Sequence, residues 1–380
     1  MSEGLDASKR TRQLAWLVWI AVAISMSGLS VSGDKHSVTG EYRSASLNWI
    51  AGRPLYSMTG HGFIYLPQTA LVFAPWGLLP EPVGAVAWRC TIVAILAAGV
   101  ARFTRLVNGD DRWFLINTIV SAATAVGCVR NGQATLIIAG LMMLACVDLG
   151  ERRWTRAAML LVLAIAFKPT ALILILLVGA LFLPMLWRLA IGLPLFAIAP
   201  FLAQNSRYAY SQYMAFFENS REAFHLGETG YWAQLFGIFK VAGVDVPLPV
   251  QEVARIVFGL ATLVVCWLAV RKLPTGRGIF YLYAISTCYL MLFNSRTEGS
   301  TYAMVAPVYG ILLASAWLKE QNRTATTWLI VGIVATVLNY ELIHLFTRQK
   351  NTEVWVCPFV CVLVTIYVVV QLFRELKSAS

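Results

Sequence analysis

Long apolar runs separated by short charged segments dominate the chain. Most runs are close to twenty residues long and apolar all round rather than along one stripe, as in helices that cross a bilayer. We expect spans at about 13–32, 82–101, 113–129, 134–149, 157–167, 171–184, 187–203, 252–270, 279–293, 302–317, 326–345 and 355–373. The pattern predicts an all-α polytopic integral membrane protein of about twelve transmembrane helices, forming a single membrane domain over residues 1–380.

Two regions depart from simple spans. The runs 157–167 and 171–184 are too short to cross the bilayer straight, so we expect half-buried or broken helices on either side of Lys168-Pro169. The run 63–79 is punctuated by prolines, which favours a short re-entrant or interfacial helix. The apolar stretch 14–31 is long enough to span and has no clear cleavage site, so it is expected to be a retained first helix.

Composition agrees with a membrane location. Hydrophobic residues make up 58% of the chain, charged residues 13%, and the mean hydropathy is +0.68, whereas a soluble domain carries roughly 25% charge. The net charge of +11 comes from small clusters rather than a basic block, so no nucleic-acid partner is expected. With the 63–79 run kept outside, more than half of the 30 Lys and Arg fall in inner segments. The positive-inside rule then predicts that both termini are cytoplasmic, and we expect a multi-pass protein of the inner (plasma) membrane.

This topology gathers polar residues on the outer face. It places there two long loops, about 33–81 and 204–251, and the short turns 130–133, 168–170 and 294–298. Residues 41–51 fit an amphipathic interfacial helix ended by Gly52. Polar groups concentrated at one membrane face predict a site at the boundary between water and lipid.

Three acids are candidates for a general base. Asp34 and Glu41 are the acids nearest the first span, and Glu298 lies in the turn 294–298. The alternative is that the first two are ordinary solvated loop charges. Asp34 ranks first, because Glu41 is already explained by the start of a helix and Glu298 has Arg296 as a local partner.

Three cations directly flank apolar runs. An unpaired Arg130, Lys168 or Arg296 would cost free energy at the edge of the bilayer, and a phosphate is a natural partner for such a group. Pairing with a protein acid or snorkelling to the interface is the alternative. The aromatic and proline-rich run 63–76 is either an interfacial anchor or a groove for a lipid tail.

The order of several motifs resembles glycosyltransferase family 87, the polyprenol-phosphate-mannose-dependent mannosyltransferases and their bacterial relatives. The motifs are WIAGRPLY (49–56), FIYLPQTALVFAPWGLLP (63–80), RNGQATLIIAGLMMLA (130–145), AIAFKPTALILILL (164–177) and NSRTEGSTYAMVAP (294–307). The resemblance covers about residues 14 to 318. It implies the GT-C fold and a base shortly after the first span, to which Asp34 is the nearest match. It also implies that Gln133, Lys168, Arg296 and Tyr302 lie near the donor phosphate and sugar.

The resemblance further implies the reaction. We expect transfer, with inversion, of a hexose such as mannose from a polyprenyl-phosphate sugar donor to an outer-face lipid or glycan acceptor, with no cofactor and no metal. The sequence holds no glycine-rich nucleotide loop, no HExxH and no GxSxG. The alternative is a transporter or flippase of a lipid-linked or anionic substrate, although no internal repeat supports it. A non-catalytic anchoring subunit is a third alternative.

Overall fold

A computed structural model describes residues 2–31, 37–57, 62–229, 231–339 and 352–379. Helix makes up 84% of the structure, and the described residues contain no strand. The α-helices are α1 (Ser2–Val31), α2 (Thr39–Ile50), α3 (Pro67–Gly77), α4 (Glu81–Leu106), α5 (Asp111–Asn131), α6 (Thr135–Gly150), α7 (Trp154–Phe167), α8 (Leu172–Leu181), α9 (Leu183–Ala203), α10 (Ser206–Thr229), α11 (Leu235–Val241), α12 (Leu248–Lys272), α13 (Thr275–Phe293), α14 (Ala306–Ala314), α15 (Arg323–Val337) and α17 (Glu353–Ala379).

The described residues include six helices that are long and apolar enough to cross a membrane, namely Ala7–Leu29 within α1, then α4, α5, α9, α12 and the part Glu353–Ser378 of α17. Four further apolar segments are shorter: α6, α7, α15 and Pro169–Leu181, which contains α8. The all-α membrane fold is therefore confirmed. Each predicted span coincides with helical residues in whole or in part, but the number of about twelve crossings stays a prediction.

Small residues allow the central helices to approach closely. A side chain at Gly140 on α6 would place its Cβ 2.6 Å from the backbone oxygen of Ile95 on α4, and the same atom at Gly99 would lie 3.0 Å from the Cα of Gly140. Neither contact has room for a methyl group. Close backbone packing of this kind is typical of helix pairs in a bilayer, and it fixes α4 against α6.

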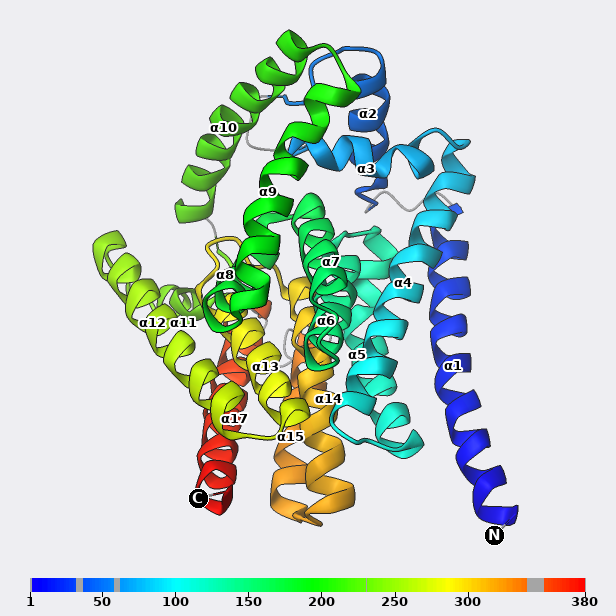
Figure 1. Cartoon of the computed structure of the whole chain (residues 1–380), viewed down its shortest axis with the longest axis vertical. Coiled ribbons are helices and arrows are strands. Elements are labelled where there is room, and N and C mark those ends of the chain that lie inside the picture. Colours follow the sequence, from blue (N-terminus) through cyan, green and yellow to red (C-terminus); the bar gives the residue numbers. More distant parts are fainter. Residues whose placement is uncertain (1, 32–36, 58–61, 230, 340–351, 380) are drawn as a thin grey trace.

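The two ends of the bundle differ. Figure 1 shows α2, α3 and α10 gathered at one end, whereas the start of α1 and the end of α17 lie at the other. The predicted short helix in the run 63–79 is α3, whose eleven residues extend about 16 Å and so cannot span a bilayer. The placement of both chain ends on one side agrees with the predicted topology, and the cytoplasmic assignment of that side stays a prediction.

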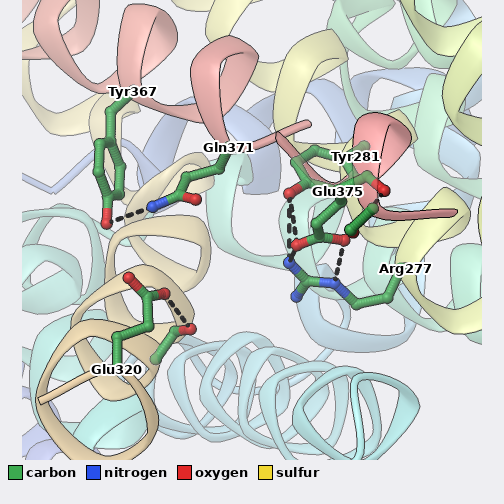
Figure 2. A network of polar contacts seen from close by, with 8 residues as sticks. Arg277, Tyr281, Glu320, Tyr367, Gln371 and Glu375 are labelled. Carbon is green, nitrogen blue, oxygen red and sulfur yellow. Dashed lines mark hydrogen bonds and ion pairs between the residues drawn. The ribbon is translucent and has the colours of Figure 1, made fainter. Parts of the chain in front are cut away.

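Acids at the end that carries the chain termini bind basic residues of the predicted inner segments. Asp148 is fully buried and makes ion pairs with Arg102 at 3.1 Å and Arg156 at 2.9 Å. Near the end of α17, Glu375 accepts hydrogen bonds from Arg277 Nε at 3.0 Å and Tyr281 Oη at 2.9 Å (Figure 2). The basic residues that set the predicted topology therefore also connect helices.

Candidate active site

A cavity of about 470 Å³ lies between α8, α10, α12, α13 and the loop that follows α13. Its polar lining includes Tyr65, Lys168, Arg255, Asn294, Arg296 and Glu298. Its apolar lining includes Ile64, Leu172, Ile173, Tyr289, Leu290 and Phe293. The cavity thus brings together three residues that the sequence predicted from separate turns: Lys168, Arg296 and Glu298.

Lys168 reaches the cavity because a helix breaks there. Pro169 disfavours a helical backbone at the residue before it, and Lys168 is extended, with φ −163° and ψ 141°. The α7 helix therefore ends at Phe167, and the chain resumes through a 3₁₀ turn, Pro169–Ala171, into α8. The predicted break at Lys168-Pro169 is confirmed.

The Lys168 ammonium is half-buried and lines the cavity. It makes no hydrogen bond or ion pair with any residue that the structure describes. An ammonium at the edge of an apolar wall without a protein partner is costly. It marks a place where an anion would be stabilised.

The loop after α13 is fastened by the segment that precedes α11. Ala233 N donates to Thr297 O at 2.7 Å, and the buried Tyr302 hydroxyl donates to Ala233 O at 3.1 Å. The Arg296 guanidinium lies over the Trp232 ring, 4.9 Å from its centroid. Tyr302 is 1% exposed and is not part of the cavity lining, so its observed contact is structural, and its predicted donor contact remains a prediction.

Arg296 is half-buried beside the cavity. Burial lowers the pKa of its guanidinium, and the nearby Glu298 and Tyr65 act in the opposite direction. Guanidinium groups are not deprotonated in proteins, so the side chain keeps its charge. The Arg296 guanidinium is therefore a permanent positive charge in the cavity that Lys168 also lines.

Glu298 is held by one partner distant in sequence and by one neighbour in its own loop. Gln133 Nε2 donates to Glu298 Oε2 at 2.9 Å, and the Ser300 hydroxyl donates to Gln133 Oε1 at 2.9 Å and to Glu298 Oε2 at 3.3 Å. The predicted donor-binding residue Gln133 and the predicted base Glu298 are thus in direct contact. Gln133 contacts a lining residue, Glu298, but is not itself part of the lining, and its predicted donor contact stays a prediction.

Two residues of α4 hold the 130–133 turn. Trp88 Nε1 donates to Gly132 O at 2.7 Å, and Arg89, which is fully buried, donates to Arg130 O at 2.7 Å and to Ser37 Oγ at 3.0 Å. Gly132 has φ +66°, a left-handed conformation that glycine adopts at little cost. The Arg130 side chain is exposed and does not line the cavity.

The two remaining candidate acids lie between α1 and α3, in the segment that the sequence predicts to be the first outer loop. Asp34 falls outside the residues that the structure describes. Glu41 is exposed in the first turn of α2. Its Oε2 atom lies close to Gly62, since a Cβ added at Gly62 would be 3.3 Å from it. Glu41 does not line the cavity, and its role stays a prediction.

The residue after Glu41 connects α2 to the cavity. The Tyr42 hydroxyl donates to the Tyr65 hydroxyl at 3.1 Å, and Tyr65 is part of the cavity lining. Burial raises the pKa of Tyr42, and the neighbouring Tyr65 and Glu298 act in the same direction. The phenol therefore stays protonated at neutral pH and serves as a hydrogen-bond donor.

Sequence reasoning missed Arg255 and Tyr65 as cavity residues. Arg255 lies on α12, donates from Nε to Phe293 O at 3.2 Å and from Nη2 to Gln251 Oε1 at 3.3 Å, and lines the cavity. Its position within an apolar run was a usable signal, because ionisable residues inside a membrane segment usually mark a functional site. Tyr65 carried no such signal among many aromatic residues.

The apolar wall of the cavity is continuous with the outer surface of the bundle. Leu172 on α8 is 40% exposed and Leu176, one turn further, is 59% exposed. Phe293 stacks at 5.0 Å on Phe258 of α12, which is itself half exposed. A cationic pocket that opens into an apolar wall has the chemistry required by an amphiphile with a phosphate head.

Comparison with known proteins gives one family. The sequence model of Glycosyltransferase family 87 matches residues 63–295, which is more than half of the chain. The match includes Lys168 and Arg255 and ends one residue before Arg296. No curated protein matches the chain.

Proposed function

Because the chain belongs to glycosyltransferase family 87 and is thus a membrane glycosyltransferase, we propose that it uses a polyprenyl-phosphate sugar as donor. The transferred group is a hexose, with mannose the first sugar to test. The acceptor is a lipid or glycan at the outer face, and the fold is of the GT-C type. No metal or soluble cofactor takes part in the proposed reaction.

One observation carries the proposal: the Lys168 ammonium, without a partner among the described residues, lines a cavity whose other wall is apolar. In the proposed complex the donor phosphate lies between Lys168 and Arg296, with Arg255 closing the site from α12. The prenyl tail lies along Leu172 and Phe293 and leaves toward the bilayer. The phosphate takes the place of the acidic partner that Lys168 does not have among the described residues.

The proposed reaction is a single displacement with inversion. The acceptor oxygen attacks the anomeric carbon from the side opposite the phosphate, the bond from that carbon to the phosphate oxygen breaks, and polyprenyl phosphate leaves with the electron pair. A carboxylate takes the acceptor proton. Asp34 is the first candidate for this base and Glu41 the second. Glu298 is third, because its Oε2 atom already accepts hydrogen bonds from Gln133 and Ser300.

A transfer assay tests the proposal against the transporter alternative. Purified protein in lipid nanodiscs receives polyprenyl phosphate carrying a radiolabelled hexose, together with an extract of envelope lipids and glycans as acceptor. A transferase releases free polyprenyl phosphate and moves the label to a new product. A flippase in sealed vesicles moves the intact labelled donor between leaflets without breaking a bond. Translocation of intact donor without any cleavage would overturn the proposal.

A further inference from the structure

A second cavity, of about 720 Å³, lies between α15 and α17. It shares no lining residue with the candidate active site, and both helices lie outside the residues matched by the family model. Most of its length is apolar, lined by Val331, Gly332, Ala335, Phe359, Val360 and Leu363. We call this cavity the α15–α17 groove.

One end of the groove is polar. Arg323, Thr324, Thr327 and Trp328 line it there, within the first turns of α15, and no acidic residue is part of the lining. The two helices run antiparallel, since Trp328 packs edge-on against Tyr367 at 5.2 Å and a Cβ at Gly332 would lie 3.1 Å from Val360. The polar end of the groove therefore lies toward the C-terminal end of α17.

The length of the groove matches one leaflet of a bilayer. Arg323 and Ala335 are twelve residues apart on α15, which corresponds to about 18 Å along a helix. Half of the hydrocarbon core is about 15 Å. A groove with a cation, hydroxyls and an indole at one end and an apolar channel of this depth fits a single acyl chain with its headgroup at the interface.

Charge at the polar end favours an anionic headgroup. Glu375 is paired with Arg277 and also accepts from Tyr281, whereas Glu320 accepts the Ser315 hydroxyl at 2.8 Å and keeps its negative charge (Figure 2). Basic residues at this end include Lys319 and Arg323 beside the start of α15 and Arg374 on α17. This is also the end that the sequence predicts to be cytoplasmic, where the leaflet carries anionic lipids.

We propose that the α15–α17 groove binds one anionic phospholipid of the inner leaflet. Its phosphate contacts Arg323, and one acyl chain lies along Val331, Ala335 and Phe359. This lipid is distinct from the sugar donor, because the two cavities lie on different helices and share no residue. The site does not depend on the proposed transfer reaction.

The test uses the full chain in nanodiscs of equimolar phosphatidylcholine and phosphatidylglycerol. Mass spectrometry of the released protein counts the lipids that stay bound. Val331→Trp fills the groove from a side chain that is 60% exposed, so the protein core is untouched, and a melting curve checks that the variant folds. Arg323→Gln removes the headgroup contact. Arg112→Gln is the matched control, since Arg112 is an exposed arginine in the first turn of α5.

We expect wild type and Arg112→Gln to retain one phosphatidylglycerol per chain, and Val331→Trp to lose it. Arg323→Gln should lower the preference for phosphatidylglycerol over phosphatidylcholine about fivefold, the effect of one basic residue near an anionic lipid surface. Equal retention by Val331→Trp, or no preference in the wild type, would overturn the proposal. So would a wild-type dimer that Val331→Trp converts to a monomer, because a second copy would then occupy the groove.

Discussion

Replacing Lys168 by Gln removes one of the three cations that line the cavity, and it should disturb the rest of the protein little. The ammonium has no hydrogen bond or ion pair to lose among the described residues, so the stability of the free protein should not fall. A hydrogen bond to a charged group contributes about 1.5–3 kcal/mol. Donor binding should therefore weaken about ten- to a hundredfold, at about 1.4 kcal/mol per tenfold.

Thermal unfolding with and without donor separates these two effects. At a donor concentration about a hundred times the wild-type Kd, binding adds about 2.7 kcal/mol to the free energy of unfolding. A variant that binds a hundredfold more weakly gains only about 0.4 kcal/mol under the same conditions. The donor is labelled polyprenyl-phosphate hexose in nanodiscs, and its Kd is measured directly in parallel.

Arg207→Gln is the control, because Arg207 is an exposed cation at the start of α10 and does not line the cavity. Its donor affinity should equal that of the wild type. If Lys168→Gln binds the donor as tightly as Arg207→Gln does, then Lys168 does not contact the phosphate. A large loss of stability in the absence of donor would instead show that Lys168 has a structural partner, and the reasoning from its missing contacts would fail.

Three further predictions follow from other parts of the chain. Asp34→Asn keeps size and hydrogen bonding but removes basicity, so single-turnover transfer should slow about a hundredfold or more while donor Kd is unchanged; normal turnover would exclude Asp34 as the base. Gly140→Leu forces a side chain against the backbone of α4 and should cost about 1–3 kcal/mol in thermal unfolding. Gly127 is exposed and a Cβ added there has no atom within 4 Å, so Gly127→Leu should melt like the wild type. A cysteine in place of the exposed Arg153 should react with an impermeant thiol reagent only from the cytoplasmic side. Labelling from outside would show that the predicted orientation in the membrane is wrong.

Features set by local sequence were predictable. Proline explains both the break at Lys168 and the shortness of α3, because each follows from the backbone of neighbouring residues. The apolar runs also predicted where the helices lie, because a run of neighbouring apolar residues forms each helix. The all-α membrane fold followed from this information, and the family followed from the order of the motifs that resemble it.

Features set by packing between distant segments were not predictable. Gln133 and Glu298 meet although they are 165 residues apart, and nothing in either turn indicates the other. The same holds for Tyr302, whose hydroxyl donates a hydrogen bond to Ala233 O. It also holds for Arg255, which lines the cavity because of the way α12 packs against α13. Several helices are also shorter than about twenty residues, so sequence runs alone do not fix how many times the chain crosses the bilayer.

The exposed apolar wall next to Lys168 determines which concentration governs occupancy of the site. Because exposed Leu172 in the cavity lining is one turn from exposed Leu176, the proposed polyprenyl-phosphate donor would arrive by lateral diffusion, and its relevant concentration would be a mole fraction within the bilayer. Diluting the membrane with inert lipid lowers occupancy, whereas changing the volume of buffer leaves it the same. With such a donor, the rate in the cell would follow the density of donor molecules in the membrane plane, and any protein that makes the donor in the same membrane would act as a local source.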